Sequence, residues 1–345
     1  MTQPSLYVPV LRSHAAERDA VRELDPSVRR LMAPLFEVSR KSALEMEDLP
    51  AHAVARKLVQ LTFGSAGQGE MYIDPTALAA RNDLTAICAE IERLLLSLHS
   101  DAQFVFRLDD FGRSSGVGSA RQLMERNGCA FRVITSDYSG PSLSNIASLL
   151  KKAGIDARNV DLLVDCQIVA KGERMRGTAA KLENDHAWRS ITYLGGSFPP
   201  NLVQLKKNDQ HELPRHEWIA FSSEGHDRRT RFGDYTVQHP LQPDPPLKTL
   251  PSGSIRYTSD DYWVVMRGEK LDNPTGPGHE QYIAQAQLLC GRPEYRGRSF
   301  SAGDEYIYVI ATEMKQTGNP KTWLQAAMNH HMTLAARQIS AALAA

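Results

Sequence analysis

Short apolar runs and helical patterns alternate along the first two thirds of the chain. The helical patterns, such as LTAICAEIERLLLSLH over 84–99, repeat apolar residues at the spacing of one helix face. The apolar runs are shorter and rich in branched and aromatic residues, which is typical of buried strands. Eight runs stand out: Leu6–Leu11, Ala33–Val38, Glu70–Pro75, Gln103–Asp109, Ala130–Ser136, Val160–Val169, Ile191–Gly196 and Trp218–Ser223.

This alternation predicts a parallel sheet that is covered by helices. Eight units fit a closed (β/α)8 barrel of the TIM type, which typically has about 250 residues. An open doubly wound sheet is the rival, but no glycine-rich nucleotide fingerprint follows the first strand. The segment GRSSGVGSA, Gly112–Ala120, has neither that fingerprint nor a P-loop lysine, and it predicts a flexible loop. We therefore expect a (β/α)8 barrel over residues 1–237.

The pattern changes after residue 237. Residues 238–254 are proline-rich and polar, which indicates a loop or linker. Two β-like runs predict a hairpin over 255–268, and an alanine-rich stretch predicts a helix over about 320–343. We expect residues 238–345 to form a C-terminal extension that packs on the barrel. His330 and His331 would point about 100° apart on that helix, so we interpret them as structural or interfacial.

Composition limits the class of protein. The formal net charge is 0, which argues against a surface that is basic throughout and coats nucleic acid. Four cysteines lie far apart, which indicates reduced and mostly buried thiols in a cytoplasmic protein. No apolar run approaches the roughly 20 residues that cross a bilayer, so we expect no membrane association. The sequence leaves the oligomeric state open.

Acidic residues recur where the predicted strands end. In a barrel, functional side chains gather at the carboxyl ends of the strands. An acid in a core-forming strand must be paired or must bind a ligand, and several converging acids need a cation or shared protons. The candidate catalytic residues are Glu37, Asp74, Asp109 and Asp165.

Three interpretations of these acids stay open. Asp74, Asp109 and Asp165 would suit Mg²⁺ or Mn²⁺, which prefer oxygen ligands, whereas no motif indicates zinc. A pair such as Glu37 and Asp165 would instead act as general acid and base, as in a glycosidase. In the structural alternative, Arg107 pairs with Asp74 or Asp109, and a buried ion-pair network plugs the top of the barrel.

Glycines and arginines near the later strand ends predict an anion site. The segment ITYLGGSFPPN ends the seventh predicted strand in two glycines, and barrels often bind phosphate after strands seven and eight. Bare backbone amides beside arginines suit an anion. The alternatives are a turn that only glycine can make and a solvated charge run. The candidate substrate-binding or anion-binding residues are Arg107, Gln167, Gly195, Gly196, Ser197, Arg228 and Arg231.

Several segments form a recognisable set: YVPVLRSHAAERDAVREL, PLFEV, YIDP, FRLDD, YLGGSFP, FGDY and RYT…WVVMRG…FSAGDEYI. With this set, from Tyr7 to about Ile307, the chain resembles the beta family proteins, named after a bacteriophage T4 beta protein. The resemblance implies an origin in bacteria or phages and a link to phage–host conflict or mobile elements. It implies no particular activity and assigns no catalytic residues.

We therefore expect a hydrolase that acts on a phosphate-containing substrate, a nucleotide or nucleic acid, with a divalent cation at the barrel mouth. The alternative is a non-catalytic barrel that recognises a phage or toxin protein through its C-terminal region. A glycosidase is the third interpretation.

Overall fold

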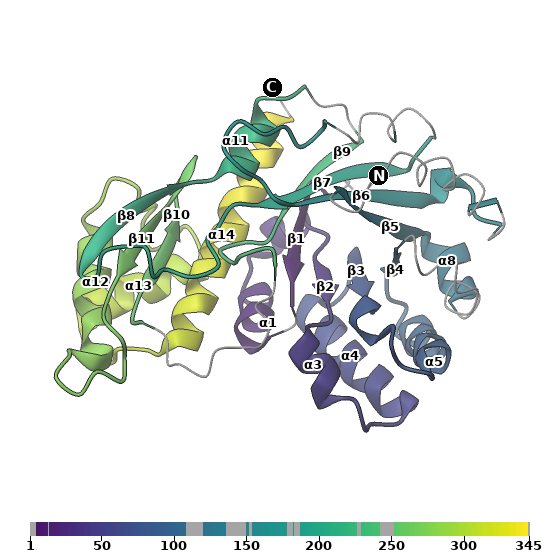
Figure 1. Cartoon of the computed structure of the whole chain (residues 1–345), viewed down its shortest axis with the longest axis horizontal. Helices are drawn as coiled ribbons and strands as arrows, with labels where there is room; N and C mark the ends of the chain where they lie inside the picture. The colour runs from purple at the N-terminus through teal and green to yellow at the C-terminus, as the bar shows by residue number, and fades with distance from the viewer. Residues whose placement is uncertain are drawn as a thin grey trace.

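A closed barrel of eight parallel strands is the main feature of the computed structural model (Figure 1). The structure describes residues 5–12, 14–107, 120–135, 150–151, 154–177, 182, 187–225, 229–241 and 252–343. The last strand, β9, pairs with β1 and closes the barrel. The barrel strands are β1 (Tyr7–Leu11), β2 (Leu35–Glu37), β3 (Met71–Asp74), β4 (Ala102–Phe106), β5 (Cys129–Ile134), β6 (Val160–Ile168), β7 (Ser190–Gly196) and β9 (Thr230–Asp234).

Helices surround these strands, which confirms the predicted (β/α)8 fold. Apolar side chains between the strands and the helices make up most of the core. The helices in this part of the chain are α1 (Ala15–Arg22), α2 (Pro26–Arg29), α3 (Arg40–Glu45), α4 (Ala51–Ala66), α5 (Leu84–Ser97), α8 (Arg121–Asn127) and α11 (His216–Ser222), with short 3-10 turns η1 (Thr76–Leu78) and η4 (Ala157–Asn159).

Burial on both faces explains why the strands are almost continuously apolar. Side chains such as Val10, Leu35 and Leu163 fill the inside of the barrel, while Phe36 and Phe104 pack outward beneath the helices. A parallel strand that is covered on both faces has no solvent side for polar residues. The few charged side chains inside the strands therefore need buried partners.

The prediction of a strand over Trp218–Ser223 is wrong. Residues His216–Ser222 form helix α11, and the eighth barrel strand is Thr230–Asp234. The apolar side of α11 covers that strand, because the ring of Phe221 packs 4.9 Å from the ring of Phe232. Periodicity does not distinguish a short apolar run in a helix from one in a buried strand.

A three-stranded antiparallel sheet stands beside the barrel, in the order β10-β11-β8 (Figure 1). Strands β10 (Ile255–Thr258) and β11 (Tyr262–Arg267) pair within the stretch where the hairpin was expected. Strand β8 (Asp209–Pro214) precedes residue 238 and pairs with β11. The sheet thus joins segments on both sides of the expected boundary, and the division of the chain after residue 237 stays a prediction.

Three helices follow the hairpin: α12 (Gln281–Cys290), which begins after the turn η5 (Gly278–Glu280), α13 (Ala302–Glu313) and α14 (Pro320–Ala342). Helix α14 runs between the sheet and the barrel (Figure 1) and contacts α1 and β1 as well as β10. Met332 and Ile339 belong to the barrel core, whereas Trp323 belongs to a second core with the sheet, α12 and α13. One helix therefore contributes to both cores.

The adjacent histidines of α14 reach different carboxylates. His331 Nε2 lies 2.9 Å from Asp234 Oδ2 at the end of β9, and His330 Nδ1 lies 2.8 Å from Asp304 Oδ2 on α13. Both histidines are buried. The pair connects α14 to the barrel on one side and to α13 on the other, which confirms its structural interpretation.

The close crossing of α13 and α14 predicts that a larger residue at Gly303 would destabilise the protein. A Cβ at Gly303 would lie 2.2 Å from the carbonyl oxygen of Ala326 on α14, so Gly303→Ala should force the helices apart and cost about 1–3 kcal/mol of unfolding free energy. Gly64→Ala on α4 is the control, because its Cβ meets nothing within 4 Å and should stabilise the protein by about 0.5–1 kcal/mol. Urea denaturation of both variants measures the difference. Equal effects at the two sites would show that the helices are not in close contact.

Candidate functional site

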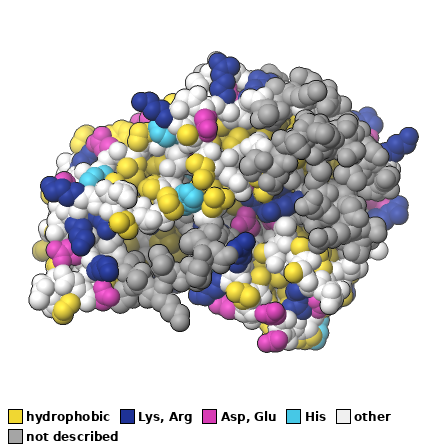
Figure 2. Space-filling model, in the orientation of Figure 1, with side chains coloured by type: hydrophobic (Ala, Val, Ile, Leu, Met, Phe, Trp, Pro, Cys, Tyr) yellow, Lys and Arg dark blue, Asp and Glu magenta, His cyan; other side chains and the backbone are white. Residues whose placement is uncertain are grey.

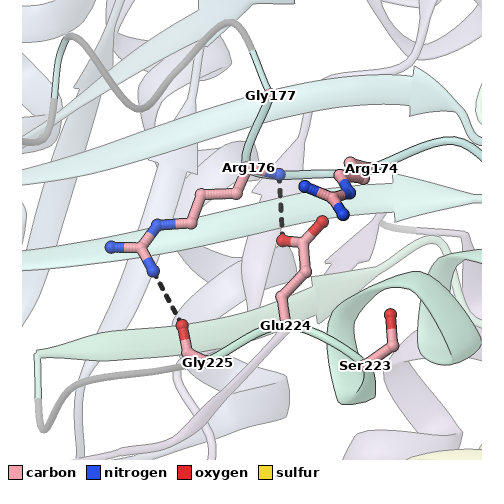
Figure 3. A pocket seen from close by; sticks show the side chains of 6 residues that line it. All are labelled: Arg174, Arg176, Gly177, Ser223, Glu224 and Gly225. Carbon is pink, nitrogen blue, oxygen red and sulfur yellow. Dashed lines mark hydrogen bonds between the residues drawn. The ribbon is translucent and has the colours of Figure 1, made fainter.

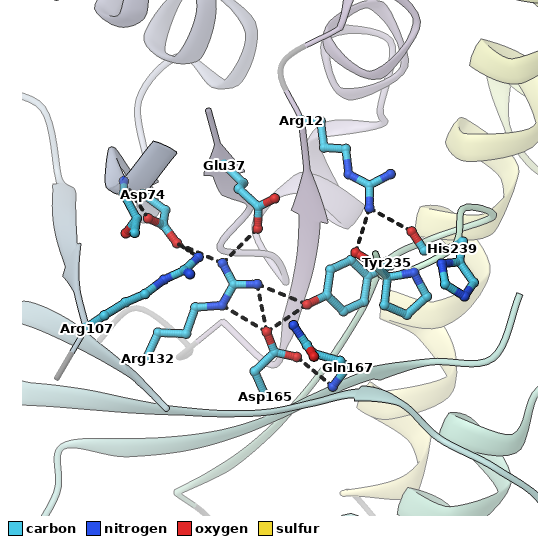
Figure 4. A network of polar contacts seen from close by, with 11 residues as sticks. Arg12, Glu37, Asp74, Arg107, Arg132, Asp165, Gln167, Tyr235 and His239 are labelled. Atoms are coloured by element: carbon cyan, nitrogen blue, oxygen red, sulfur yellow. Dashed lines mark hydrogen bonds and ion pairs between the residues drawn. The ribbon is translucent and has the colours of Figure 1, made fainter. Parts of the chain in front are cut away.

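Arg132 is the centre of a buried polar cluster at the carboxyl-end mouth of the barrel (Figure 4). It lies two residues after Ala130 on β5, so both side chains share the inward face. Glu37 ends β2, Asp74 ends β3, and Asp165 lies on β6 beside the last residue of β5. Three of the four predicted acids therefore come together in space.

All five N–H groups of Arg132 have acceptors. Nη1 donates to Glu37 Oε2 at 2.8 Å and to Asp74 Oδ2 at 2.7 Å. Nη2 donates to Asp165 Oδ2 at 2.7 Å and to the Tyr235 hydroxyl at 2.9 Å, and Nε donates to Asp165 Oδ2 at 3.0 Å. A guanidinium has five donors, so this arrangement commits the whole group to the protein.

The electrostatics of the cluster keep Asp74 ionised and Tyr235 neutral. Burial by itself raises the pKa of Asp74, but the guanidiniums of Arg107 and Arg132 outweigh burial and hold that pKa well below its usual range. Arg107 Nη2 lies 3.2 Å from Asp74 Oδ2. Burial and the charge of Asp165 raise the pKa of Tyr235 well above its usual range. The phenol therefore donates its proton to Asp165 Oδ2, at 2.7 Å.

Solvent exposure divides the cluster into two groups. The side chains of Arg132, Asp74 and Asp165 are 2%, 0% and 0% exposed. Glu37 is 15% exposed and Arg107 is 28% exposed. Glu37 and Arg107 are thus the charged members that a ligand at the mouth can touch, and the others hold them in place.

Gln167 follows Asp165 in a left-handed backbone conformation, with φ of +54°. Its N–H donates to Asp165 Oδ1 at 2.9 Å, and the register of β6 against β7 shifts between Asp165 and Ile168. A non-glycine residue in this conformation costs on the order of 1–3 kcal/mol. Figure 4 shows the side chain of Gln167 beside Asp165, at the mouth where the sequence placed it.

The two glycines that end β7 serve close packing. A Cβ at Gly195 would lie 2.6 Å from Val169 Cγ2 and 2.8 Å from Met175 Cε, and one at Gly196 would lie 3.0 Å from Pro240 Cγ. Neither glycine has a positive φ, so a turn that only glycine can make is not the reason for them.

Ser197, the next residue, uses its hydroxyl within the protein. Ser197 Oγ donates to Glu217 Oε2 at 2.6 Å and accepts from the N–H of His216 at 2.9 Å. Both partners lie on α11, so Ser197 connects the end of β7 to this helix. Gly195 and Gly196 are buried in this arrangement, and Ser197 is partly exposed.

Arg231 lies at the opposite end of the barrel. It is the second residue of β9, and its Nη1 donates to Glu70 Oε1 at 2.8 Å and to the Tyr72 hydroxyl at 2.9 Å. The prediction that placed it in a loop after the eighth strand is wrong, because it lies inside that strand. Asp109 and Arg228, the remaining predicted site residues, lie outside the described residues.

Within the described residues, no group of three or more histidine, cysteine, aspartate or glutamate side chains is arranged to hold a metal ion. The geometry gives a physical reason. Asp74 and Asp165 both accept hydrogen bonds from Arg132, whose guanidinium lies where the carboxylates converge. A cation at that point would have to displace a positive charge that is already bonded there.

Sequence reasoning missed Arg132 and Arg12. A lone arginine inside the apolar run AFRVITS needs a buried partner as much as a lone acid does, so the signal for Arg132 was present. Arg12 follows β1, and its Nη2 donates to the carbonyls of His239 at 2.6 Å and Pro240 at 2.7 Å. It holds the segment after β9 against the mouth, and nothing in its local sequence marks that role.

These features define a (β/α)8 barrel protein whose mouth contains carboxylates arranged around one arginine. Residues 7–337 match the family described as Beta protein, and the chain belongs to that family. The match covers nearly the whole chain and confirms the resemblance that the short segments indicate. Among curated proteins, none matches this chain. Within the described residues, no helix is long and apolar enough to cross a membrane.

The cluster predicts a large loss of stability when Arg132 is removed. Arg132→Met should lower the unfolding free energy by about 3–5 kcal/mol near neutral pH, because three carboxylates lose the guanidinium of Arg132, although Asp74 keeps its ion pair with Arg107. Arg121→Met is the control, since its partner Glu125 is 64% exposed and such pairs contribute at most about 1 kcal/mol. The deficit of Arg132→Met should shrink in acid, where protonated carboxyls need no cation. Similar small losses in both variants would contradict the arrangement.

The raised pKa of Glu217 predicts that the stability of the protein depends on pH. Burial raises its pKa to about 7 despite the nearby Arg215, from an ordinary value of 4.5. Between these two values the folded state keeps a proton that the unfolded state releases, so this group makes stability fall as pH rises from about 4.5 to 7. Glu217→Gln should remove that slope. The unfolding free energy of Glu217→Gln minus that of the wild type should be larger at pH 8 than at pH 5. The same difference at both pH values would contradict the raised pKa of Glu217.

Proposed function

We propose that the protein is a hydrolase of phosphate-containing substrates that works at the carboxyl-end mouth of the barrel. One observation supports this more than any other. A fully bonded core of Arg132, Asp74 and Asp165 presents one carboxylate, Glu37, and one guanidinium, Arg107, toward solvent. A base beside an anion-binding cation is the pair of groups that hydrolysis of a phosphoester uses.

Each of these two partly exposed groups has a role in this proposal. Arg107 binds the phosphate oxygens and offsets the charge that develops on them in the transition state. Glu37 accepts a proton from a water molecule, which attacks the phosphorus atom. The P–O bond to the leaving group breaks, and the leaving oxygen takes a proton from solvent. Arg132 is a positioning residue, because its bonds fix the carboxylate of Glu37 and share Asp74 with Arg107.

Surface charge favours a nucleotide over a long nucleic acid as the substrate. The formal net charge is 0, and on the described part of the face in Figure 2 basic and acidic side chains are interspersed. Binding to a nucleic-acid backbone draws most of its strength from clustered lysine and arginine. A mononucleotide needs only a local cation such as Arg107.

A metal-dependent form of the proposal assigns Mg²⁺ or Mn²⁺ to Asp74, Asp109 and Asp165. In that form the cation would lower the pKa of a bound water molecule and so supply the nucleophile. Asp74 and Asp165 would first have to give up their bonds to Arg132. We favour the metal-independent form, in which the arrangement around Arg132 stays as it is.

A second candidate function is recognition of a protein, such as a phage component or a toxin. The saturated bonding of Arg132 supports it as well, because a plugged and catalytically silent barrel has the same appearance. The chain belongs to the Beta protein family. The resemblance of that family to a phage protein is the basis for connecting either function to phage–host conflict. The two candidates differ in whether the purified protein turns over a phosphoester.

The hydrolase proposal predicts separate effects of substituting Glu37 and Arg107, the two partly exposed groups. Glu37→Gln should lower kcat by about 10²–10⁴-fold, because the general base is lost while an oxygen acceptor for Arg132 remains. Arg107→Ala should mainly raise KM, because it removes phosphate binding. The measurement is steady-state hydrolysis of bis(p-nitrophenyl) phosphate and of nucleoside monophosphates, with and without Mn²⁺.

The matched control is Glu45→Gln, which changes a 52% exposed carboxylate on α3 and should leave both constants unchanged. If the well-folded wild-type protein hydrolyses none of these substrates, the hydrolase proposal is wrong. Protein recognition would then be the function to test.

A further inference from the structure

A separate pocket lies on the flank of the barrel, between the loop that follows β6 and the end of α11 (Figure 3). Its volume is about 410 Å³. None of its residues belongs to the cluster around Arg132. The pocket is lined by Arg174, Arg176, Gly177, Ser223, Glu224 and Gly225.

Hydrogen bonds fix the walls of this flank pocket. The N–H of Arg176 donates to Glu224 Oε2 at 3.1 Å, and Arg176 Nη1 donates to the carbonyl of Gly225 at 2.8 Å. Between the two arginines, Met175 is buried against β7, where Gly195 leaves room for it. The two walls are therefore joined to each other and to the barrel, and a ligand would meet a preformed site.

The flank pocket has opposite charges with unused bonding capacity. Within the described residues, the exposed guanidinium of Arg174 has no hydrogen bond or ion pair. Glu224 uses Oε2 for Arg176, while its buried Oε1 has no hydrogen-bond partner among the residues that the structure describes. A buried carboxylate oxygen without a donor costs free energy, which a ligand with an N–H group would recover.

We propose that the flank pocket binds a small molecule that joins an anionic group to an N–H donor. Arg174 would bind the phosphate or carboxylate, and Glu224 would accept from the N–H group. Two sources share this chemistry. One is a nucleotide whose base offers N–H donors, as guanine does, since acidic side chains accept from base amino groups. The other is an α-amino acid, whose ammonium and carboxylate are the two groups.

Size and charge narrow the class of ligand further. A volume of about 410 Å³ is near the small end of ligand sites, which fits one nucleotide or amino acid rather than a polymer. A simple anion would satisfy Arg174 but would be repelled by Glu224. A simple cation would bind Glu224 but would be repelled by Arg174. This site is independent of the proposed hydrolase, because it shares no residue with the mouth.

Isothermal titration calorimetry of the full chain tests the proposal, with guanosine monophosphate, glycine and inorganic phosphate as three separate probes. We expect saturable binding of guanosine monophosphate or of glycine, and the stronger of the two identifies the source. Inorganic phosphate should bind at least 10-fold more weakly. Arg174→Ala and Glu224→Gln should each weaken the favoured probe by 10-fold or more. Lys171→Ala, an exposed cation on the same loop outside the lining, should leave its affinity unchanged.

Loss of folding should not be the cause of weaker binding in these variants. Arg174 is exposed, and glutamine at position 224 keeps an oxygen acceptor for the N–H of Arg176, so both variants should melt at the wild-type temperature. The proposal is overturned if guanosine monophosphate and glycine both fail to bind, if phosphate alone binds as tightly as either, or if the two variants bind like the wild type.

Discussion

The bonding of Arg132 is the constraint on which the mouth of the barrel depends. Moving an ion from water into a protein interior costs several kcal/mol, which is recovered only through close opposite charge and complete hydrogen bonding. Asp74 and Asp165 are fully buried, and Arg132 donates to both. Without that cation, three carboxylates would converge in a region of low dielectric constant, and Arg107 would offset the charge of Asp74. The position of Glu37 at the surface of the cluster follows from this bonding.

A second charged layer closes the other end of the barrel. Arg189 Nη2 lies 2.6 Å from Asp161 Oδ2, and Arg231 Nη1 lies 2.8 Å from Glu70 Oε1. Apolar side chains such as Leu163 fill the space between the two layers. The barrel is therefore a packed core with paired charges at both ends. The mouth brings its charged groups together with a residue in a left-handed backbone conformation, Gln167, near the end of β6.

Helix α14 joins this barrel to the neighbouring sheet. It packs beside α1, where a (β/α)8 barrel places its last helix, and it also covers β10. Removing the chain from residue 238 onward would take away this helix together with β10 and β11, and β8 would lose its partner strand. Such a truncation would expose the barrel core, so point substitutions are the sounder way to separate recognition from folding.

The sequence predicts the fold well because buried parallel strands and amphipathic helices leave local patterns. LTAICAEIERLLLSLH became α5 as its periodicity indicates. The charged partners depend instead on contacts between distant parts of the chain: Arg132 meets Glu37 across 95 positions, and Arg231 meets Glu70 across 161. The run WIAFSS has the apolar content of a buried strand although it lies in α11, so local pattern predicts the eighth strand there and not at Thr230–Asp234.

The site was predictable to the extent that it follows from the fold. Carboxyl ends of parallel strands meet at one mouth, so the convergence of Glu37, Asp74 and Asp165 was expected. The group that fills the space between these acids was not predictable. A metal ion and a guanidinium both require converging acidic side chains, so the acids alone do not distinguish them. Local sequence also gave no sign that Gly195 makes room for Met175 rather than for a ligand.

The most direct test of this account is a calorimetric titration of Mn²⁺ into the chelator-treated protein, with Asp165→Asn alongside. If Arg132 occupies the point where the carboxylates converge, the wild-type protein should show no saturable binding that the variant lacks. Saturable binding in the wild type that disappears in Asp165→Asn would contradict the account, because the carboxylates would then hold a metal ion in place of the guanidinium.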